Sequence, residues 1–206
     1  AQVIRGDDNL PDFDLRAALP SLPWIYGESP ETPYAQCPYL VAPAGLRSAP
    51  AAKVAGRRIG LVWAGNPNHI NDKQRSIPQE TLLELTKFDS FNWYSLQVGA
   101  SDKAKRALAR AGVTDLAPGF SDFADTAAAI QALDLVITVD TSVAHLAGAL
   151  GKPVWILLPF VPDWRWLLDR SDSPWYPSAR LFRQPKRGDW ASVLKEVKQA
   201  LADFRP

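Results

Sequence analysis

The sequence has 206 residues, of which 47% are hydrophobic and 22% are charged, and its formal net charge is +1. This composition supports a packed core and excludes an intrinsically disordered chain. The near-neutral charge argues against a clamp with a general basic field, so we expect no nucleic-acid partner. A single cysteine, Cys37, excludes a disulfide framework within the chain and a multi-cysteine metal site, and we expect no metal.

The sequence contains neither an apolar run long enough to cross a membrane nor a visible signal peptide. We therefore expect no membrane span and a cytoplasmic location. The chain begins at Ala1 and contains no methionine. We expect it to be a processed product or a piece of a longer protein.

Residues 1–56 differ from the rest in their proline content. Eight of the 18 prolines lie in the first 50 residues. Proline at this density prevents long helices and central strands, so we predict mostly irregular chain. Residues 44–58 are small and basic and are typical of a linker.

From Arg58 onward, short apolar runs alternate with helical patterns. The predicted elements, in chain order, are a strand at 58–63, a helix at 78–88, a strand at 92–97, helices at 101–112 and 123–133, a strand at 134–139, a helix at 141–150, a strand at 153–158, an aromatic loop at 159–178 and a helix at about 189–204. The strands are continuously apolar, which is typical of a parallel sheet covered on both faces. We predict a Rossmann-like α/β unit over residues 57–206.

Open parallel sheets bind ligands beyond the carboxyl ends of their strands, where the loops 64–76, 97–101, 140–142 and 159–178 are expected. The loop 140–142 opens a helix, and a helix start offers unpaired N–H groups and a positive dipole end to phosphate. Thr141 and Ser142 add hydroxyl groups. Simple N-capping by Asp140 or Thr141 would explain the same residues.

His145 lies one turn into this helix. The face expected to cover the sheet consists of Val143, Leu146, Ala147 and Leu150. Thr141 and His145 share the opposite face, so His145 is either exposed to solvent or directed at a ligand above the helix start. We favour the ligand, beside which the pKa of His145 would rise.

The loop 64–76 combines a flexible glycine, Gly65, with several hydrogen-bonding and cationic side chains. Such a composition also occurs by chance in surface loops. Its place after a strand nevertheless favours a ligand role, in which Arg75 could pair with a second phosphate group.

The loop 159–178 is rich in aromatic residues, which could stack on a sugar or a base. We favour packing anchors instead, with Asp163 and Arg165 as the better ligand candidates. Three common signatures are absent from the sequence: the dinucleotide G-x-G-x-x-G, the P-loop and the hydrolase G-x-S-x-G. We treat the D-x-D at 12–14 as chance.

Three stretches, "RIGLVWAGNPNHINDKQRSIP", the run from Asp122 to Pro185 that contains "DTSVAHLAGALGKPVW", and "GDW", together carry a family resemblance. The sequence resembles bacterial tetratricopeptide-repeat proteins with a glycosyltransferase-like C-terminal region. That region is similar to glycosyltransferase family 9, the ADP-heptose–LPS heptosyltransferases, and more distantly to the O-linked N-acetylglucosamine transferases. The resemblance covers residues 10–206.

The resemblance implies a GT-B fold, in which residues 57–206 form the C-terminal lobe and residues 1–56 the tail of an N-terminal lobe plus a linker. It implies diphosphate binding and leaving-group stabilisation, with His145 and Arg75 as catalytic residues. The diphosphate site would also include Asp140, Thr141, Ser142, Val143 and Asn66. Contacts to base and ribose would come from Leu96, Gln97, Asp125 and Thr126. The catalytic base would lie in an N-terminal lobe, so we name none.

The expected function is therefore metal-independent glycosyl transfer without a cofactor, from a nucleoside-diphosphate sugar to a glycan, a lipid-linked sugar or a protein. Tetratricopeptide repeats are expected in the parent chain. An alternative is a catalytically inactive module that binds nucleotide or protein partners. A nucleotide-sugar epimerase of the same fold is a weaker alternative.

Overall fold

The computed structural model describes residues 12–18, 21–29, 36–46 and 56–204. The chain divides into two compact units, Ala1–Tyr34 and Ala35–Pro206. Within the first unit, the described residues contain one short helix, α1 (Leu22–Ile25), in otherwise irregular chain, as the proline content predicts. The predicted linker at 44–58 lies largely outside the described residues.

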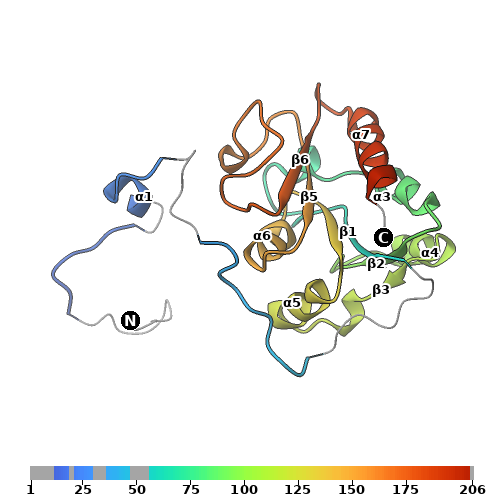
Figure 1. Cartoon of the computed structure of the whole chain (residues 1–206), viewed down its shortest axis with the longest axis horizontal. Helices are drawn as coiled ribbons and strands as arrows, with labels where there is room; N and C mark the ends of the chain where they lie inside the picture. Colours follow the sequence, from blue (N-terminus) through green and yellow to red (C-terminus); the bar gives the residue numbers. More distant parts are fainter. Residues whose placement is uncertain (1–11, 19–20, 30–35, 47–55, 205–206) are drawn as a thin grey trace. The chain divides into compact units, whose positions relative to one another are not determined.

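A parallel sheet of six strands forms the centre of the second unit (Figure 1). Its strands are β1 (Arg58–Val62), β2 (Asn92–Ser95), β3 (Thr114–Asp115), β4 (Leu135–Val139), β5 (Val154–Leu158) and β6 (Ala179–Arg183). Their order is β3-β2-β1-β4-β5-β6, and all five pairings are parallel. This is the doubly wound Rossmann order, in which the winding reverses between β1 and β4.

Helices cover both faces of the sheet (Figure 1). They are α2 (Asp72–Arg75), α3 (Gln79–Leu82), α4 (Asp102–Arg110), α5 (Phe123–Gln131), α6 (Ser142–Ala149) and α7 (Trp190–Asp203), with the 3-10 helices η2 (Leu83–Lys87), η3 (Ala117–Gly119) and η4 (Trp164–Trp166). The predicted parallel α/β fold is thereby confirmed.

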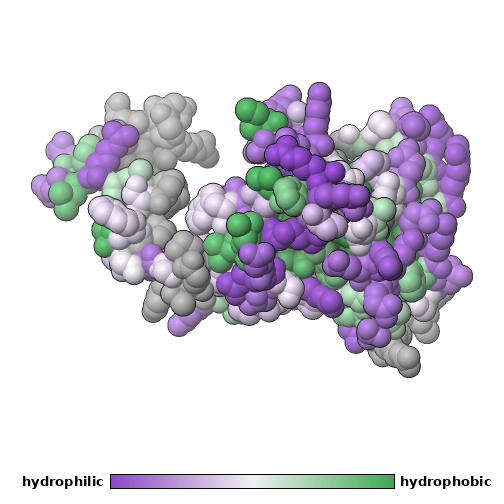
Figure 2. Space-filling model, turned by 90° about the horizontal axis from the view of Figure 1, so that it is seen from above, coloured by the Kyte–Doolittle hydropathy of each residue, from purple (hydrophilic) through white to green (hydrophobic). Residues whose placement is uncertain are grey.

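Alternate residues of each central strand point to opposite faces of the sheet. In β4, Leu135 and Ile137 belong to the hydrophobic cluster under α3, α4 and α7, whereas Val136 belongs to the cluster under α5 and α6. Both clusters are buried, which explains why the strand sequences are continuously apolar. On the face of the molecule seen in Figure 2, hydrophilic residues dominate and single hydrophobic residues are scattered among them.

The predicted helix ends are confirmed where capping chemistry is clear. The Ser101 side chain accepts a hydrogen bond from the Ala104 N–H, and Gly112 follows α4 with a φ of 71°. The single helix predicted at 78–88 is instead α3 followed by η2. There the Thr86 hydroxyl donates to the carbonyl of Leu83, three residues earlier, which matches the spacing of a 3-10 turn.

The second unit also contains a segment from the proline-rich region. The backbone N–H groups of Tyr39 and Leu40 both donate to the Ala149 carbonyl at the end of α6, and the Cys37 thiol donates to the Gly148 carbonyl. The compact unit therefore begins at Ala35, ahead of residue 57. The division into an N-lobe tail and a C-terminal lobe stays a prediction.

No helix within the described ranges combines the length and apolar character needed to cross a membrane.

Candidate functional site

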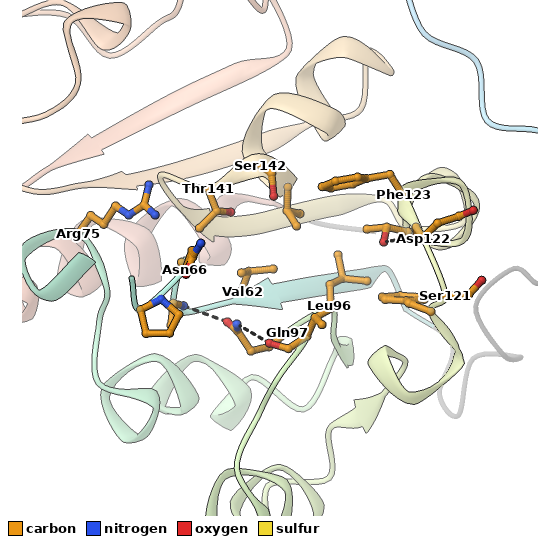
Figure 3. A pocket seen from close by; sticks show the side chains of 17 residues that line it. Val62, Asn66, Arg75, Leu96, Gln97, Ser121, Asp122, Phe123, Thr141 and Ser142 are labelled. Carbon is orange, nitrogen blue, oxygen red and sulfur yellow. Dashed lines mark hydrogen bonds between the residues drawn. The ribbon is translucent and has the colours of Figure 1, made fainter. Parts of the chain in front are cut away.

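A pocket of about 570 Å³ opens at the carboxyl ends of β1, β2 and β4 (Figure 3). It lies at the topological switch point, where open α/β sheets bind their ligands. Its lining residues come from the loops after these strands and from the starts of α5 and α6: Val62, Ala64, Gly65, Asn66, Pro67, Arg75, Leu96, Gln97, Val98, Phe120, Ser121, Asp122, Phe123, Thr126, Thr141, Ser142 and Val143.

The two ends of the pocket differ in chemistry. Figure 3 shows Arg75, Asn66 and Thr141 at one end. It shows Ser121 and Phe123 at the other end, with Val62 and Leu96 between the ends. A cationic, hydroxyl-bearing end and an aromatic end together suit a ligand with an anionic part and a flat part.

The start of α6 is not capped by a side chain. Thr141 occupies the N-cap position, yet no side chain caps the helix, because the Thr141 hydroxyl pairs instead with the Thr138 hydroxyl at 3.2 Å. The capping interpretation of 140–142 is therefore wrong. The first backbone N–H groups of α6 remain available to an anion in the pocket, beside the exposed Ser142.

Arg75 reaches the pocket from the end of α2. Its Nε lies 3.3 Å from Asp72 Oδ1, and its side chain is only 15% exposed. Gly65 makes this position possible, because a Cβ at that residue would overlap the guanidinium group. Within the described part of the chain, the pocket wall contains no other arginine or lysine.

Gln97 lies in the pocket wall, but its amide is mostly engaged with the backbone. Its Oε1 accepts hydrogen bonds from Trp63 N at 3.1 Å and Ala64 N at 2.9 Å, and its Nε2 donates to Val98 O. These bonds tie the end of β1 to the end of β2. The structure therefore gives Gln97 a supporting role in shaping the pocket.

Thr126 and Asp125 were both predicted to contact the base or ribose, but only Thr126 lines the pocket. Thr126 is buried in the pocket wall, and its hydroxyl donates to the Asp122 carbonyl. Asp125 does not line the pocket. Its carboxylate accepts hydrogen bonds from the N–H and hydroxyl of Ser121, which lower the pKa of Asp125.

His145 and Asp140 lie behind the pocket rather than in its wall. The His145 ring stacks on Trp166, with ring centroids 5.2 Å apart, and its Nδ1 lies 3.0 Å from the Tyr176 hydroxyl. Its Nε2 lies 4.0 Å from Asp140 Oδ1. The side chain of His145 is therefore only partly exposed, and it does not line the pocket.

Burial sets the direction of both pKa shifts in this pair. It lowers the pKa of His145, against the opposing effect of the Asp140 charge. It raises the pKa of Asp140, against the effects of the nearby Trp166 indole and of His145. The indole Nε1 of Trp166 is buried and completes no hydrogen bond within the described ranges. The predicted rise in the His145 pKa requires a bound anion.

The helical face expected to cover the sheet is partly revised. Val143 and Ala147 are buried, as predicted, but the fully buried Ala144 takes the place of Leu146, which is half-buried. In the loop 159–178, Trp166 and Tyr176 are buried and pack as predicted, whereas Trp164 is 58% exposed. Asp163 caps η4 and pairs with Arg165 at 2.9 Å.

The sequence reasoning missed the aromatic end of the pocket. Phe120, Ser121, Asp122 and Phe123 line it, and Phe123 is 60% exposed. An exposed phenylalanine directly after a capping aspartate, at the carboxyl edge of the sheet, is a signal that could have been used. Among the described residues, no cluster of three or more His, Cys, Asp or Glu side chains could hold a metal.

Comparisons with known proteins place this geometry in context. Residues 96–157 match glycosyltransferase family 9 (heptosyltransferase). Protein FlbA of Caulobacter vibrioides is 38% identical over 84 residues, which are 41% of this chain and 14% of that protein.

Solved structures share the fold. The E. coli heptosyltransferase WaaC with ADP-2-deoxy-2-fluoro heptose is 18% identical, with a TM-score of 0.56 over 88% of this chain and 53% of that one. The E. coli ADP-heptose lps heptosyltransferase II is also 18% identical, with a TM-score of 0.53 over 73% of this chain and 48% of that one. The chain spans about half the length of these proteins.

Proposed function

We propose that this chain is the donor-binding lobe of a glycosyltransferase that takes its sugar from a nucleoside-diphosphate donor. One observation carries the proposal. The pocket at the switch point joins an uncapped helix start and a half-buried arginine to an aromatic wall. The match of residues 96–157 to glycosyltransferase family 9 supports the same activity.

The donor would lie along the pocket with its diphosphate at the start of α6. The N–H groups of Ser142 and Val143 would donate to the phosphate oxygens, and Arg75 would neutralise part of their charge. The nucleoside would extend toward Phe123, where an exposed ring can stack on a base. Thr126 would line its path, and Asn66 would lie beside the diphosphate.

The chemistry follows from where charge develops. When an acceptor hydroxyl attacks the anomeric carbon, a new carbon–oxygen bond forms, the sugar–phosphate bond breaks and the nucleoside diphosphate leaves with additional negative charge. The proton of the hydroxyl would pass to the catalytic base, which the family resemblance places in an N-terminal lobe. Arg75, the N–H groups of α6 and His145 would stabilise that charge without a metal or cofactor. Loss of a donor of this kind typically costs about 3 kcal/mol of barrier.

The identity of the donor belongs to the same proposal. A heptose or a hexose carried by a nucleoside diphosphate fits, and the two E. coli proteins are named for ADP-linked heptose. The acceptor is a glycan, a lipid-linked sugar or a protein. Tetratricopeptide repeats in the parent chain and the distant O-GlcNAc transferase likeness rest on the sequence resemblance alone. A cytoplasmic location rests on the sequence features described above.

Calorimetric titration of the chain with ADP, UDP and GDP tests the binding part. We expect at least one to bind, and Arg75→Gln to weaken it by about tenfold or more, because a charge-assisted hydrogen bond is lost. Arg110→Gln is the matched control, since Arg110 lies at the exposed end of α4 outside the pocket. If Arg75→Gln and Arg110→Gln bound the nucleotide with equal affinity, the proposed site would be contradicted.

Turnover is tested in the full-length parent. We expect transfer or slow hydrolysis of the donor, and a strong loss of rate in His145→Ala. A parent that binds nucleotide but neither transfers nor hydrolyses the donor would identify the non-catalytic module instead.

A further inference from the structure

Four side chains, those of Tyr39, Tyr176, His145 and Asp140, form a series of polar contacts outside the pocket wall. The Tyr39 hydroxyl lies 3.5 Å from the Tyr176 hydroxyl. The Tyr176 hydroxyl lies 3.0 Å from Nδ1 of His145, and the far ring nitrogen, Nε2, lies 4.0 Å from Asp140 Oδ1. The contacts thus run from the segment 36–46 to Asp140, which directly follows β4.

Packing holds these rings in place. Tyr176 is 7% exposed and lies directly against Gly148 of α6, where a Cβ would overlap its ring. The His145 ring stacks on the fully buried Trp166, with an angle of 19° between the ring planes. Because His145 is wedged against two aromatic rings, it cannot rotate freely to exchange its hydrogen-bond partners.

The neighbours of His145 decide which ring nitrogen carries the proton. A neutral imidazole has one N–H donor and one acceptor nitrogen. A proton on Nε2 faces the Asp140 carboxylate favourably, whereas a lone pair there would face a negative charge. Nδ1 must then accept, and the Tyr176 hydroxyl must donate.

The Tyr176 hydroxyl is suited to this role. Burial, assisted by the neighbouring Tyr39 hydroxyl, raises the pKa of Tyr176, so the group keeps its proton at neutral pH. While it donates to Nδ1, its oxygen can still accept a hydrogen bond from Tyr39. Every group in the chain of contacts then has a compatible role.

We propose that Tyr176, supported by Tyr39, is a positioning residue that holds His145 as the Nε2–H tautomer. His145 thereby presents a fixed N–H donor beside the start of α6, where the leaving phosphate of a donor would lie. The part that concerns the donor rests on the proposed function; the part that concerns the tautomer does not. The side chain of His145 is 38% exposed, which leaves it accessible to such a ligand.

Nitrogen-15 NMR of the imidazole rings in the full chain tests the tautomer directly. The sequence has only two histidines, so His69→Gln assigns both sets of signals. We expect His145 to show the Nε2–H pattern at neutral pH, and Tyr176→Phe to shift it toward a mixture of tautomers. Tyr94→Phe, which removes the hydroxyl of a buried tyrosine on β2, is the control and should leave the tautomer of His145 unchanged.

The same variants connect the tautomer to ligand binding. With the nucleoside diphosphate that binds the unmodified chain, we expect Tyr176→Phe to weaken affinity about two- to tenfold, as for one neutral hydrogen bond. Tyr39→Phe should have a smaller effect in the same direction. Thermal unfolding of each variant checks that the fold is retained.

The outcomes separate the two proposals. An Nδ1–H pattern in the unmodified chain, or an unchanged pattern in Tyr176→Phe, overturns the role of Tyr176 even if nucleotides bind. If no nucleoside diphosphate binds but Tyr176→Phe shifts the tautomer, the positioning role stands and the proposed function fails.

Discussion

Two glycines make room for the side chains that matter most at the site. A Cβ at Gly65 would overlap the Arg75 guanidinium group, and a Cβ at Gly148 would overlap the Tyr176 ring. At Gly148 the Cβ would meet the body of a buried ring, and at Gly65 it would force the ends of the Arg75 and Asp72 side chains to shift. The positions of Arg75 and His145 therefore depend on residues that carry no functional group.

The lowered pKa of His145 predicts a pH effect on stability. Because the unfolded chain protonates this residue at a higher pH than the folded chain does, acidification from pH 7 through the unfolded value near 6.5 favours unfolding. Its charged neighbours Asp140, Asp163 and Arg165 act on it in the folded state. We expect the free energy of unfolding in urea to fall less between pH 7 and pH 5 in His145→Gln than in the unmodified protein.

His69→Gln is the control for that measurement. His69 lies in the exposed loop after β1, away from the cluster around His145, so its replacement leaves the contribution of His145 in place. Parallel curves for His145→Gln and the unmodified protein would show that His145 titrates alike in the folded and unfolded chains.

At the scale of elements, the two helices that flank the pocket begin differently. Asp122 caps α5, because its carboxylate accepts hydrogen bonds from the N–H groups of Ala124 and Asp125. The start of α6 has no such cap. Because the Asp122 carboxylate already accepts hydrogen bonds from the first N–H groups of α5, an external anion would have to displace it. Of the two helices, α6 is therefore the one that offers free N–H groups to a ligand.

Adding a carboxylate to the start of α6 should therefore have opposite effects on stability and on binding. We expect Ser142→Asp to stabilise the ligand-free protein by about 0.3–1 kcal/mol through the helix dipole. It should also weaken nucleoside-diphosphate binding strongly, because the new charge repels the phosphates. Urea unfolding and calorimetry measure the two effects.

Ala191→Asp provides a matched comparison for Ser142→Asp. It places the same carboxylate near the start of α7, at an exposed position outside the pocket at the switch point. We expect unchanged nucleotide affinity. A loss of affinity in both variants would point to a general charge effect and contradict a specific site at α6.

At the scale of the whole molecule, the segment 36–46 belongs with the sheet. Its backbone donates to the last turn of α6, Cys37 packs against the cluster under α5 and α6, and Tyr39 contacts Tyr176. The unit Ala1–Tyr34 is compact by itself. The stability of the sheet should therefore depend on the segment 36–46.

Two truncations test this dependence. The chain without residues 1–34, which keeps the segment 36–46, gives the reference free energy of unfolding of the sheet. Removal of residues 1–46 should lower it by about 1–3 kcal/mol, because two backbone hydrogen bonds and the apolar contacts of Cys37 are lost. Equal stability of both truncated chains in urea would contradict a structural role for 36–46.

The elements that local patterns predict best are those whose chemistry is local. The strands β1, β4 and β5 follow from continuous apolar runs, and α4 follows from Ser101 and Gly112 at its ends. The two-residue strand β3 was not predicted, because so short a run carries no periodicity. The partition of 78–88 into α3 and η2 was missed because it depends on the packing of that segment.

The sequence by itself determined the parallel α/β class, because burial on both faces requires apolar strands, and it predicted a ligand site at the carboxyl ends of those strands. The strand order, and with it the switch point, came from the structure. Tertiary structure alone decided how the site is built. In the structure, Gln97 supports the pocket through hydrogen bonds to the backbone, and the start of α6 has no side-chain cap. Phe123 lines the pocket, and His145 contacts Tyr176. These arrangements join residues far apart in the chain, and their geometry depends on packing that no local pattern encodes.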